Sequence, residues 1–307
     1  MLYDDLLVFL KDDQVKKNER LEHHTTLHIG GEADYLVTPS SLEEIKKVLS
    51  LCQKEELPFF VMGNGSNLLV SDSGYRGIII KLGEKFSQVK IDEEGIVTAQ
   101  AGVLLSKLAN KIARHGLTGF EFAAGIPGTL GGAVTMNAGA YGGEMKQCVV
   151  KCKVLDTEGN IKELNKDQLE LGYRTSILQK KDYILLEAVL KLDKGNPDEI
   201  LDMIEDLNSR RRSKQPLEKY SCGSTFKRPT GYYAGKLIQD AGLKGYSVGG
   251  AAVSEKHSGF VVNKGSASAK DFLAVINDVS RIVYERFGVK LEPEVRFLGD
   301  FEGPVIE

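Results

Sequence analysis

The sequence has no marked excess of either charge and few residues suited to metals or disulfides. Its 40 Lys and Arg nearly balance 43 Asp and Glu, for a net charge of −3, whereas nucleic-acid-binding proteins usually show a basic excess. Four scattered cysteines make neither a disulfide framework nor a CxxC pair, and the five histidines have no metal-ligand spacing. We therefore expect no nucleic-acid partner, no metal site and no disulfide scaffold.

Long apolar runs are also missing. No run approaches the roughly 20 residues that a membrane-spanning helix needs, so we expect no membrane partner. The N-terminal MLYDDLLVFLKDDQ has a short apolar run between acids, unlike a signal peptide, which starts with basic residues. We expect a protein of the reducing cytoplasm. A GxxxxGK[ST] motif is absent, which argues against a P-loop NTPase.

Helical and strand-like segments are mixed along the 307 residues, a length that suggests about two domains. Apolar spacing and capping residues predict four helices, which begin near Ser41, Leu105, Asn196-Pro197 and Ser268. Strand-like runs occupy 58–62, 67–71, 77–82, 96–101, 149–156, 184–192, 259–263 and 294–298. The pattern predicts an α+β fold, and a composition shift over 195–216 marks the best domain boundary.

Glycine is abundant, with 33 residues, and the first cluster of interest is FVMGNGSNLLV at 60–70. Leu68 stands where a dinucleotide fingerprint needs its third glycine, and LLVS reads as a strand where that fingerprint needs a helix, so this is not a Rossmann turn. Gly63, Gly65, Ser66 and Asn67 could instead form a nest of backbone amides for an anion such as pyrophosphate. An ordinary hairpin explains this segment about as well.

The second cluster is AGIPGTLGGAVTMNAGAYGG at 124–143. Gly125, Gly128, Gly131 and Gly132 let a ligand approach the main chain where a Cβ would block it, and Pro127 fixes one φ angle. A loop packed on its own neighbours is the alternative, but the apolar flanks are unlike a flexible linker and favour ligand contact. Together, the two clusters indicate a large dinucleotide cofactor bound outside a Rossmann fold.

Several motifs, in order, resemble a known family. They are TTLHIGGEADYLVTP (25–39), GNGSNLLVSDSGYRG (63–77), GLTGFEFAAGIPGTLGGAVTMNAGAYGGE (116–144), LGYRTSILQKK (171–181), RRRSKQPLEKYSCGSTFKRP (210–229), YAGKLIQDAGLKG (233–245) and LEPEV (291–295). The N-terminal half resembles FAD-binding domains of the vanillyl-alcohol-oxidase (PCMH) type. More narrowly, the chain resembles the UDP-N-acetylenolpyruvoylglucosamine reductase (UDP-N-acetylmuramate dehydrogenase) family of bacterial peptidoglycan precursor synthesis.

The resemblance implies an α+β fold with a two-subdomain, PCMH-type FAD-binding module and a C-terminal α+β domain for the UDP-sugar. We expect FAD-binding subdomain 1 at 1–80, joined by a returning strand within 291–307, subdomain 2 at 81–198 and the substrate domain at 199–290. The family implies non-covalent FAD, NADPH as co-substrate and hydride transfer from NADPH through FAD to UDP-N-acetylglucosamine enolpyruvate. It also implies a bacterial enzyme of cell-wall biogenesis, and we expect a monomer.

Residues are carried over position by position. The cofactor-binding set that we expect is Gly63, Asn64, Gly65, Ser66, Asn67, Leu68, Gly125, Ile126, Pro127, Gly128, Gly131, Gly132, Ala133, Asn137, Ala138 and Gly139. The substrate-binding set is Tyr173, Lys214, Lys227, Arg228, Lys236 and His257. Lys214 belongs to the basic run 210–214. This run could instead stabilise the C-terminus of a helix through favourable interaction of its cations with the helix dipole.

Three residues match the family's catalytic set. Arg174 would hold the substrate carboxylate with a planar, bidentate donor, although a surface arginine would look the same in sequence. Ser224 would protonate the α-carbon, with Lys227 supporting the resulting alkoxide. Glu294 would stabilise or orient the enol intermediate. By pattern alone, Ser224 reads as a turn residue and Glu294 as a solvent-facing residue of an edge strand.

The chain departs from part of the family. Longer members insert a tyrosine-bearing loop after the GYR segment, whereas one strand and one helix fill 177–210 here, so the chain resembles the shorter type. Arg228 stands where longer members often carry asparagine. Two alternatives stay open, namely an FAD-dependent oxidase acting on another substrate and a non-catalytic flavin or UDP-sugar sensor.

Overall fold

The computed structural model describes residues 2–301, which form two compact units. Unit 1 comprises the chain up to Lys17, Tyr35–Asn64 and Gly77–Arg211, and unit 2 comprises Asn18–Asp34, Gly65–Arg76 and the chain from Arg212 onward. The boundary after Arg211 falls within 195–216, where the composition shifts. The expected domain limits at 80, 198 and 290 stay predictions, and the end of the expected returning segment, 302–307, lies outside the described residues.

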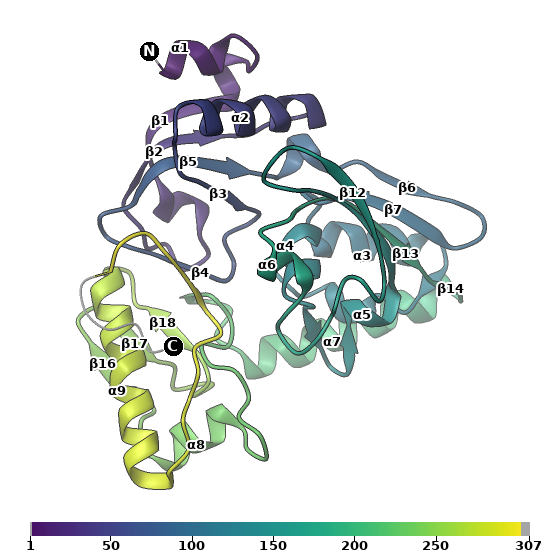
Figure 1. Ribbon diagram of the computed structural model, residues 1–307. Coiled ribbons are helices and arrows are strands. Elements are labelled where there is room, and N and C mark those ends of the chain that lie inside the picture. Colours follow the sequence, from purple (N-terminus) through teal and green to yellow (C-terminus); the bar gives the residue numbers. More distant parts are fainter. Residues whose placement is uncertain (1, 302–307) are drawn as a thin grey trace. The chain divides into compact units, whose positions relative to one another are not determined.

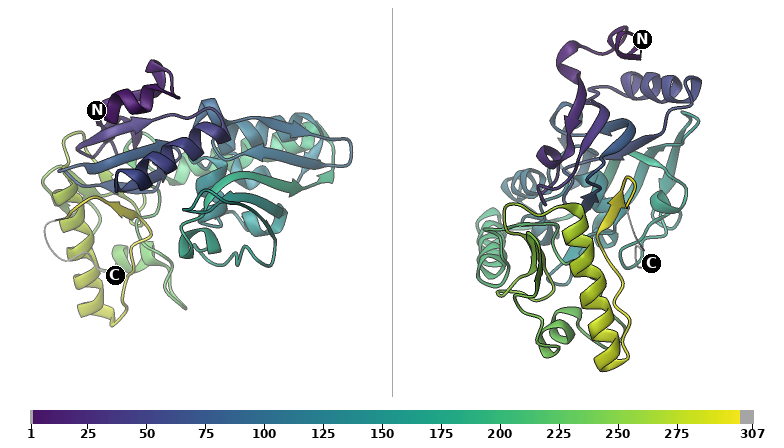
Figure 2. Two further views of the ribbon diagram at one scale, coloured as in Figure 1. Left: turned by 45° about the horizontal axis from the view of Figure 1, so that its top comes forward. Right: turned by 90° about the vertical axis from the view of Figure 1, so that its left-hand side faces the viewer.

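One sheet has the strand order β1-β2-β5-β3, from β1 (Val15–Arg20), β2 (Glu32–Val37), β5 (Tyr75–Lys81) and β3 (Phe59–Met62). Strands β3 and β5 are parallel, with Phe59 opposite Ile78. Helix α2 (Leu42–Lys54) runs along one face of this sheet (Figures 1 and 2). Ser41 caps α2 by accepting a hydrogen bond from Glu44 N, so the predicted helix start is confirmed.

The larger sheet of unit 1 has the order β12-β11-β13-β7-β6, and its neighbouring strands are antiparallel. Its strands are β6 (Val89–Ile91), β7 (Ile96–Gln100), β11 (Val149–Leu155), β12 (Ile161–Asn165) and β13 (Ile184–Lys191). Helix α4 (Leu130–Thr135) packs on β13 and β7, which places the second glycine cluster against the sheet. Helix α3 (Leu105–Arg114) buries Leu105, Leu108 and Ile112, as the spacing predicts.

The sheet of unit 2 has the order β15-β18-β17-β16, from β15 (Tyr220–Ser221), β16 (Ser247–Val248), β17 (Ala251–Val253) and β18 (Val261–Asn263). Helix α9 (Ala269–Phe287) packs on β16, β17 and β18 (Figures 1 and 2). Ser268 and Asp271 form the predicted capping box, and Gly288 ends the helix in the left-handed conformation with φ 66°. Both predicted ends of this helix are therefore confirmed.

A pair of parallel strands in unit 2 contains the last residues of the first glycine cluster, 68–70. β4 (Leu68–Val70) pairs in parallel with β19 (Arg296–Leu298), whereas β3 belongs to the sheet with β5. β3 and β4 thus belong to different sheets, so the segment between them is not an ordinary hairpin turn.

The remaining helical and strand segments are short, apart from the long helix α7. They are α1 (Leu2–Leu7), η1 (Asp12–Gln14), η2 (Leu21–His24), η3 (Glu84–Phe86), β8 (Leu117–Thr118), η4 (Glu121–Ala123), β9 (Gly139–Ala140), β10 (Gly143–Glu144), α5 (Met145–Cys148), α6 (Ile177–Lys180), β14 (Asp193–Lys194), α7 (Pro197–Lys214) and α8 (Ala234–Asp240). No helix within residues 2–301 is long and apolar enough to cross a membrane.

All four cysteines are buried free thiols. Cys222 packs in the apolar core of unit 2, where burial raises the pKa of its thiol to about 12. The interpretation of Cys222 as a small packing residue is confirmed.

Candidate active site

The two glycine clusters meet inside unit 1. Asn64 Nδ2 donates a hydrogen bond of 2.6 Å to the carbonyl oxygen of Pro127. A Cβ on Gly63 would overlap Thr129 Oγ1 and lie 3.1 Å from Thr129 Cβ, so only glycine allows this close approach. Two segments that the sequence links to one cofactor therefore lie against each other at 63–64 and 127–129.

Part of the second cluster is helical rather than a bare loop. Thr129 caps α4 through its side chain, which accepts a hydrogen bond from Gly132 N, and Gly131 and Gly132 form the first turn. The sequence analysis missed Thr129, although a threonine before a short apolar segment is an N-cap signal. A Cβ on Gly132 would have only Thr129 Oγ1 nearby, at 3.9 Å. Packing within the protein therefore does not explain the glycine at position 132.

The other cofactor candidates of unit 1 follow along the same segment. Gly125 and Ile126 are half-buried, Pro127 is exposed, and Gly128 and Ala133 are buried. Ala138 and Gly139 are half-buried and lead into β9, where a Cβ on Gly139 would lie 2.6 Å from the Gly143 carbonyl oxygen. Packing against the backbone of Gly143 therefore explains the glycine at position 139 without a ligand.

The turn that carries Arg174 is tied to the second glycine cluster. Asn137 Nδ2 donates to Gly172 O at 3.0 Å, and Ser176 Oγ donates to Thr135 O at 2.7 Å. Gln179 Nε2 bridges Thr135 O, at 2.7 Å, and Arg174 O, at 3.3 Å. Unit 1 thus brings Arg174 together with the predicted cofactor segment. The sequence analysis missed the role of Gln179, because a contact across 44 residues has no local signal.

The backbone of Arg174 is strained. Its φ of 55° lies in the left-handed region, which non-glycine residues rarely adopt. Such conformations persist where surrounding contacts fix them, and they concentrate at functional sites. The half-buried guanidinium also lies 5.4 Å from the centre of the Tyr173 ring. Arg174 is therefore not an ordinary surface arginine.

Unit 2 brings Ser224 and Glu294 into one hydrogen-bonded region. The buried Thr225 accepts from Glu294 N through its carbonyl, at 2.8 Å, and from Val261 N through its hydroxyl, at 2.9 Å. The next residues pair as well, because Phe226 and Pro293 form a β-bridge. Ser224 itself is exposed and follows Gly223, whose φ is 83°. Its hydroxyl is thus presented to solvent on a fixed backbone.

Glu294 also connects to the end of the first glycine cluster. Asn67 Nδ2 donates to Glu294 O at 3.0 Å, and Asn67 O accepts from Arg296 N at 3.0 Å. Glu294 is half-buried and precedes β19, so the simple edge-strand interpretation is wrong. Both the side-chain amide and the backbone carbonyl of Asn67 are therefore already hydrogen-bonded to the backbone of the 294–296 segment.

The remaining residues of the first cluster differ in character. A Cβ on Gly65, whose φ is 61°, would overlap the carbonyl oxygen of His24, which explains this glycine by packing alone. Ser66 is half-buried. Leu68 is buried at the start of β4, opposite Arg296.

The substrate candidates of unit 2 are mostly engaged in local pairs. Lys227 Nζ lies 3.3 Å from the Glu292 carboxylate, Lys236 Nζ lies 2.8 Å from that of Asp240, and the Arg228 guanidinium stacks 4.0 Å from the Tyr233 ring centre. The two ion pairs are exposed and therefore weak, so a charged ligand could compete for either lysine.

Three substrate candidates lie elsewhere. Tyr173 is 56% exposed, in unit 1 beside Arg174, and Lys214 is exposed at the end of α7. His257 is half-buried and accepts a hydrogen bond from Gly259 N at Nδ1, so its neutral form carries the proton on Nε2. Burial lowers the pKa of His257 below its usual value of 6.5.

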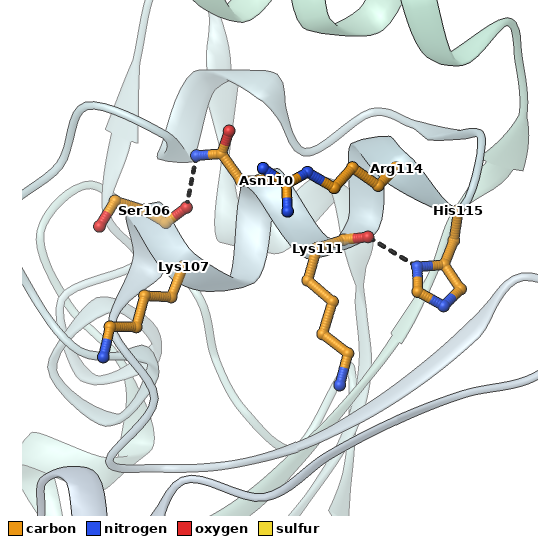
Figure 3. Close-up of a pocket in the computed structure, with 6 residues that line it drawn as sticks. All are labelled: Ser106, Lys107, Asn110, Lys111, Arg114 and His115. Carbon is orange, nitrogen blue, oxygen red and sulfur yellow. Dashed lines mark hydrogen bonds between the residues drawn. The ribbon is translucent and has the colours of Figure 1, made fainter.

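A hollow of about 570 Å³ lies along the solvent side of α3 (Figure 3). Its lining residues are Ser106, Lys107, Asn110, Lys111, Arg114 and His115. Asn110 Nδ2 donates to Ser106 O, and Lys111 O bonds to His115 Nδ1, each at 2.8 Å, so both hydrogen bonds stay within the helix. None of the residues that the sequence predicts for cofactor or substrate lines this hollow.

The residues of unit 1 fit a large cofactor that lies on bare backbone. Gly132 offers open space at the first turn of a helix, and the half-buried Asn64 and strained Arg174 flank the same segment. Among residues 2–301 no cluster of histidine, cysteine or carboxylate side chains could hold a metal ion.

Comparison with known proteins agrees with this arrangement. Residues 33–165 match the family described as FAD binding domain, and residues 215–298 match UDP-N-acetylenolpyruvoylglucosamine reductase, C-terminal domain. A UDP-N-acetylenolpyruvoylglucosamine reductase from Lachnoclostridium phytofermentans is 54% identical over 99% of both chains, and one from Clostridioides difficile is 52% identical over 97% of this chain and 98% of its own.

A solved structure extends the match to the fold. The reductase from Thermus caldophilus aligns with a TM-score of 0.79 and 37% identity, over 93% of this chain and 99% of its own. The expected PCMH-type FAD-binding module with a C-terminal reductase domain is therefore confirmed. With relatives this similar over nearly the whole chain, the chain belongs to the UDP-N-acetylenolpyruvoylglucosamine reductase family.

Proposed function

We propose that this chain uses NADPH and bound FAD to reduce the enolpyruvyl group of UDP-N-acetylglucosamine enolpyruvate to the lactyl ether of UDP-N-acetylmuramate. Beside the family membership, one observation carries the proposal. The strained turn with Arg174 is hydrogen-bonded to the glycine-rich segment through Asn137, Ser176 and Gln179. An arginine fixed beside the predicted cofactor segment would suit an anionic group of the substrate.

When bound, FAD supplies the two-electron chemistry, and the protein supplies binding, orientation and proton transfer. Arg174 would bind the carboxylate of the enolpyruvyl group and stabilise the negative charge that develops there as the double bond is reduced. Its fixed backbone reduces the entropy that this contact would otherwise cost. The strained φ angle is then part of the preorganised site.

Ser224 would donate the proton to the α-carbon. Its exposed hydroxyl stands on a backbone that Thr225 anchors to Glu294 N and Gly259 O, at 2.8 and 2.9 Å. Glu294, half-buried on the adjoining segment, would orient the enol-like species. Lys227, which forms only an exposed pair with Glu292, stays available to support the serine alkoxide.

The test is anaerobic. NADPH should bleach the absorbance of the protein-bound flavin, and UDP-N-acetylglucosamine enolpyruvate should restore it without oxygen. Return of the colour with oxygen alone would support an oxidase of another substrate instead. Bleaching with no return by either compound would support a sensor.

The role of Ser224 is tested by S224A with S247A, an exposed serine of unit 2, as the matched control. Both variants should be bleached by NADPH at the wild-type rate. Loss of a general acid should slow the substrate-dependent return by roughly 100-fold or more in S224A alone. An S224A variant that matches S247A would remove Ser224 as the proton donor.

We further propose a monomer that acts in the cytoplasm. Its four buried free thiols are typical of a reducing compartment. Sedimentation of the purified holoprotein at several concentrations would test the monomer.

A further inference from the structure

Arg211 is a buried basic side chain of unit 1 that has no assigned role. It lies near the end of α7 and is 9% exposed. Its guanidinium donates a hydrogen bond to the carbonyl oxygen of Gly125, inside the second glycine cluster. The sequence analysis had interpreted the basic run 210–214 only through Lys214 and helix C-terminal charge.

No carboxylate within residues 2–301 forms an ion pair with Arg211, and its buried Nε has no hydrogen-bond partner there. Its neutral neighbours include Tyr141, whose side chain interacts with the guanidinium and whose ring centre lies 5.9 Å from the guanidinium carbon. Burial lowers the pKa of Arg211, but an arginine keeps its proton in a protein. Unit 1 thus holds a buried positive charge without a counter-ion.

A buried, unpaired charge is costly, which makes a missing anion the simplest explanation. The position of the charge identifies that anion. A Cβ on Gly125 would lie 3.1 Å from both Arg211 Nε and Nη1, so the guanidinium lies directly against the segment predicted to hold the cofactor. FAD carries permanent negative charge on its diphosphate.

We propose that Arg211 supplies the counter-charge for bound FAD, with its Nε–H directed at an anionic oxygen of the cofactor. Arg211 is then a cofactor-binding residue, which lies on α7 and is already hydrogen-bonded to the Gly125 segment. The inference rests on the proposed use of FAD, but on none of the roles proposed for Arg174, Ser224 or Glu294.

The test compares R211Q and R211K with R210Q. Arg210 is the matched control, because it is exposed on the same helix and pairs with Asp206 at 2.7 Å. Each FAD-free protein is titrated with FAD, and its thermal unfolding is followed without cofactor. R211Q should bind FAD on the order of thirtyfold more weakly, as expected for loss of one partner of a buried charge pair. R211K should recover part of the affinity, and R210Q should match the wild type.

The thermal unfolding midpoint without cofactor distinguishes a role of Arg211 in binding FAD from a role in stabilising the fold. If Arg211 lacks its counter-ion without FAD, then R211Q without cofactor should unfold at the wild-type temperature or higher. Unchanged FAD affinity in R211Q would overturn the proposal, as would a midpoint that falls together with the affinity. Failure of the proposed function looks different, since the wild type would then bind FAD but fail to regain colour with the enolpyruvyl substrate.

Discussion

The glycine at position 132 gives the sharpest test of where the cofactor lies. Gly132 is exposed in the first turn of α4, and an added Cβ would meet only Thr129 Oγ1, at 3.9 Å. Alanine at a compatible helical position stabilises a protein by about 0.4–1 kcal/mol, chiefly by reducing the entropy of the unfolded chain. For a protein of this size the gain corresponds to a rise of roughly 1–4 °C in the unfolding midpoint without cofactor.

The same methyl group should weaken FAD binding if the cofactor lies on this turn. An inserted methyl that must be accommodated at a close-packed contact costs about 1–3 kcal/mol, which corresponds to roughly a 5- to 150-fold increase in the dissociation constant. The FAD-free protein is titrated with FAD while its flavin fluorescence is followed, and the midpoint is measured by calorimetry. We therefore expect G132A to change the two quantities in opposite directions: the unfolding midpoint without FAD should rise, and the affinity for FAD should fall.

S106A is the matched control, because Ser106 lies on α3 of the same unit and outside both glycine clusters. Its alanine should stabilise the helix by a comparable few tenths of a kcal/mol and leave FAD binding unchanged. If G132A binds FAD as tightly as S106A does, the cofactor does not lie on the first turn of α4. If G132A unfolds at a lower temperature than the wild type without cofactor, the inference that a methyl group fits freely at position 132 is wrong.

Three further outcomes are expected. G63A should cost about 1–3 kcal/mol because its Cβ would overlap Thr129, and G63A/T129A should lose less than the sum of the single variants in a denaturant-unfolding cycle. Burial lowers the pKa of His257 in the folded state, so the unfolded state binds the extra proton and the free energy of unfolding should fall as the pH drops below about 6.5. H257N, whose side chain can still accept a hydrogen bond from Gly259 N, should flatten this part of the curve of unfolding free energy against pH. An unchanged slope in H257N would exclude His257 as the source of the pH dependence. S268A should destabilise unit 2 by about 1 kcal/mol in urea, and no loss would mean that this cap is not used.

Local sequence signals predicted the four longest helices and several strands, but not β1, β2 or β12. The caps at Ser41 and Ser268 and the glycine at 288 define helix ends through bonds that span three or four residues, so they can be read from a short window. The core strands β11 and β13 lie within strand-like runs, 149–156 and 184–192, that can likewise be read from a short window. The resemblance of the motifs to one family gave the cofactor and the reaction, which the comparisons confirm.

The sequence was less informative about the glycines. At Gly63 and Gly65 the glycine is explained by a neighbour distant in sequence, Thr129 or His24, whereas at Gly132 no protein atom explains it. A sequence window treats all three alike, because it contains no information on what lies opposite a missing Cβ. The turn between β3 and β4 was equally ambiguous until the strands proved to belong to different sheets.

By itself, then, the sequence determined several of the longer helices and strands and, through the resemblance of its motifs, the family to which the chain belongs. The segments that contact FAD stay a prediction. Only the tertiary structure decided that Gly63 lies against Thr129, that Asn137 and Gln179 hold the turn of Arg174, and that Arg211 is buried with no counter-ion in the described part of the chain. The physical reason is the range of the interactions. Caps and apolar periodicity act within one or two helical turns. The contacts of Asn137 with Gly172, of Gln179 with Thr135 and of Arg211 with Gly125 instead join residues 35 to 86 positions apart, and their energies depend on burial that forms only when the chain is folded.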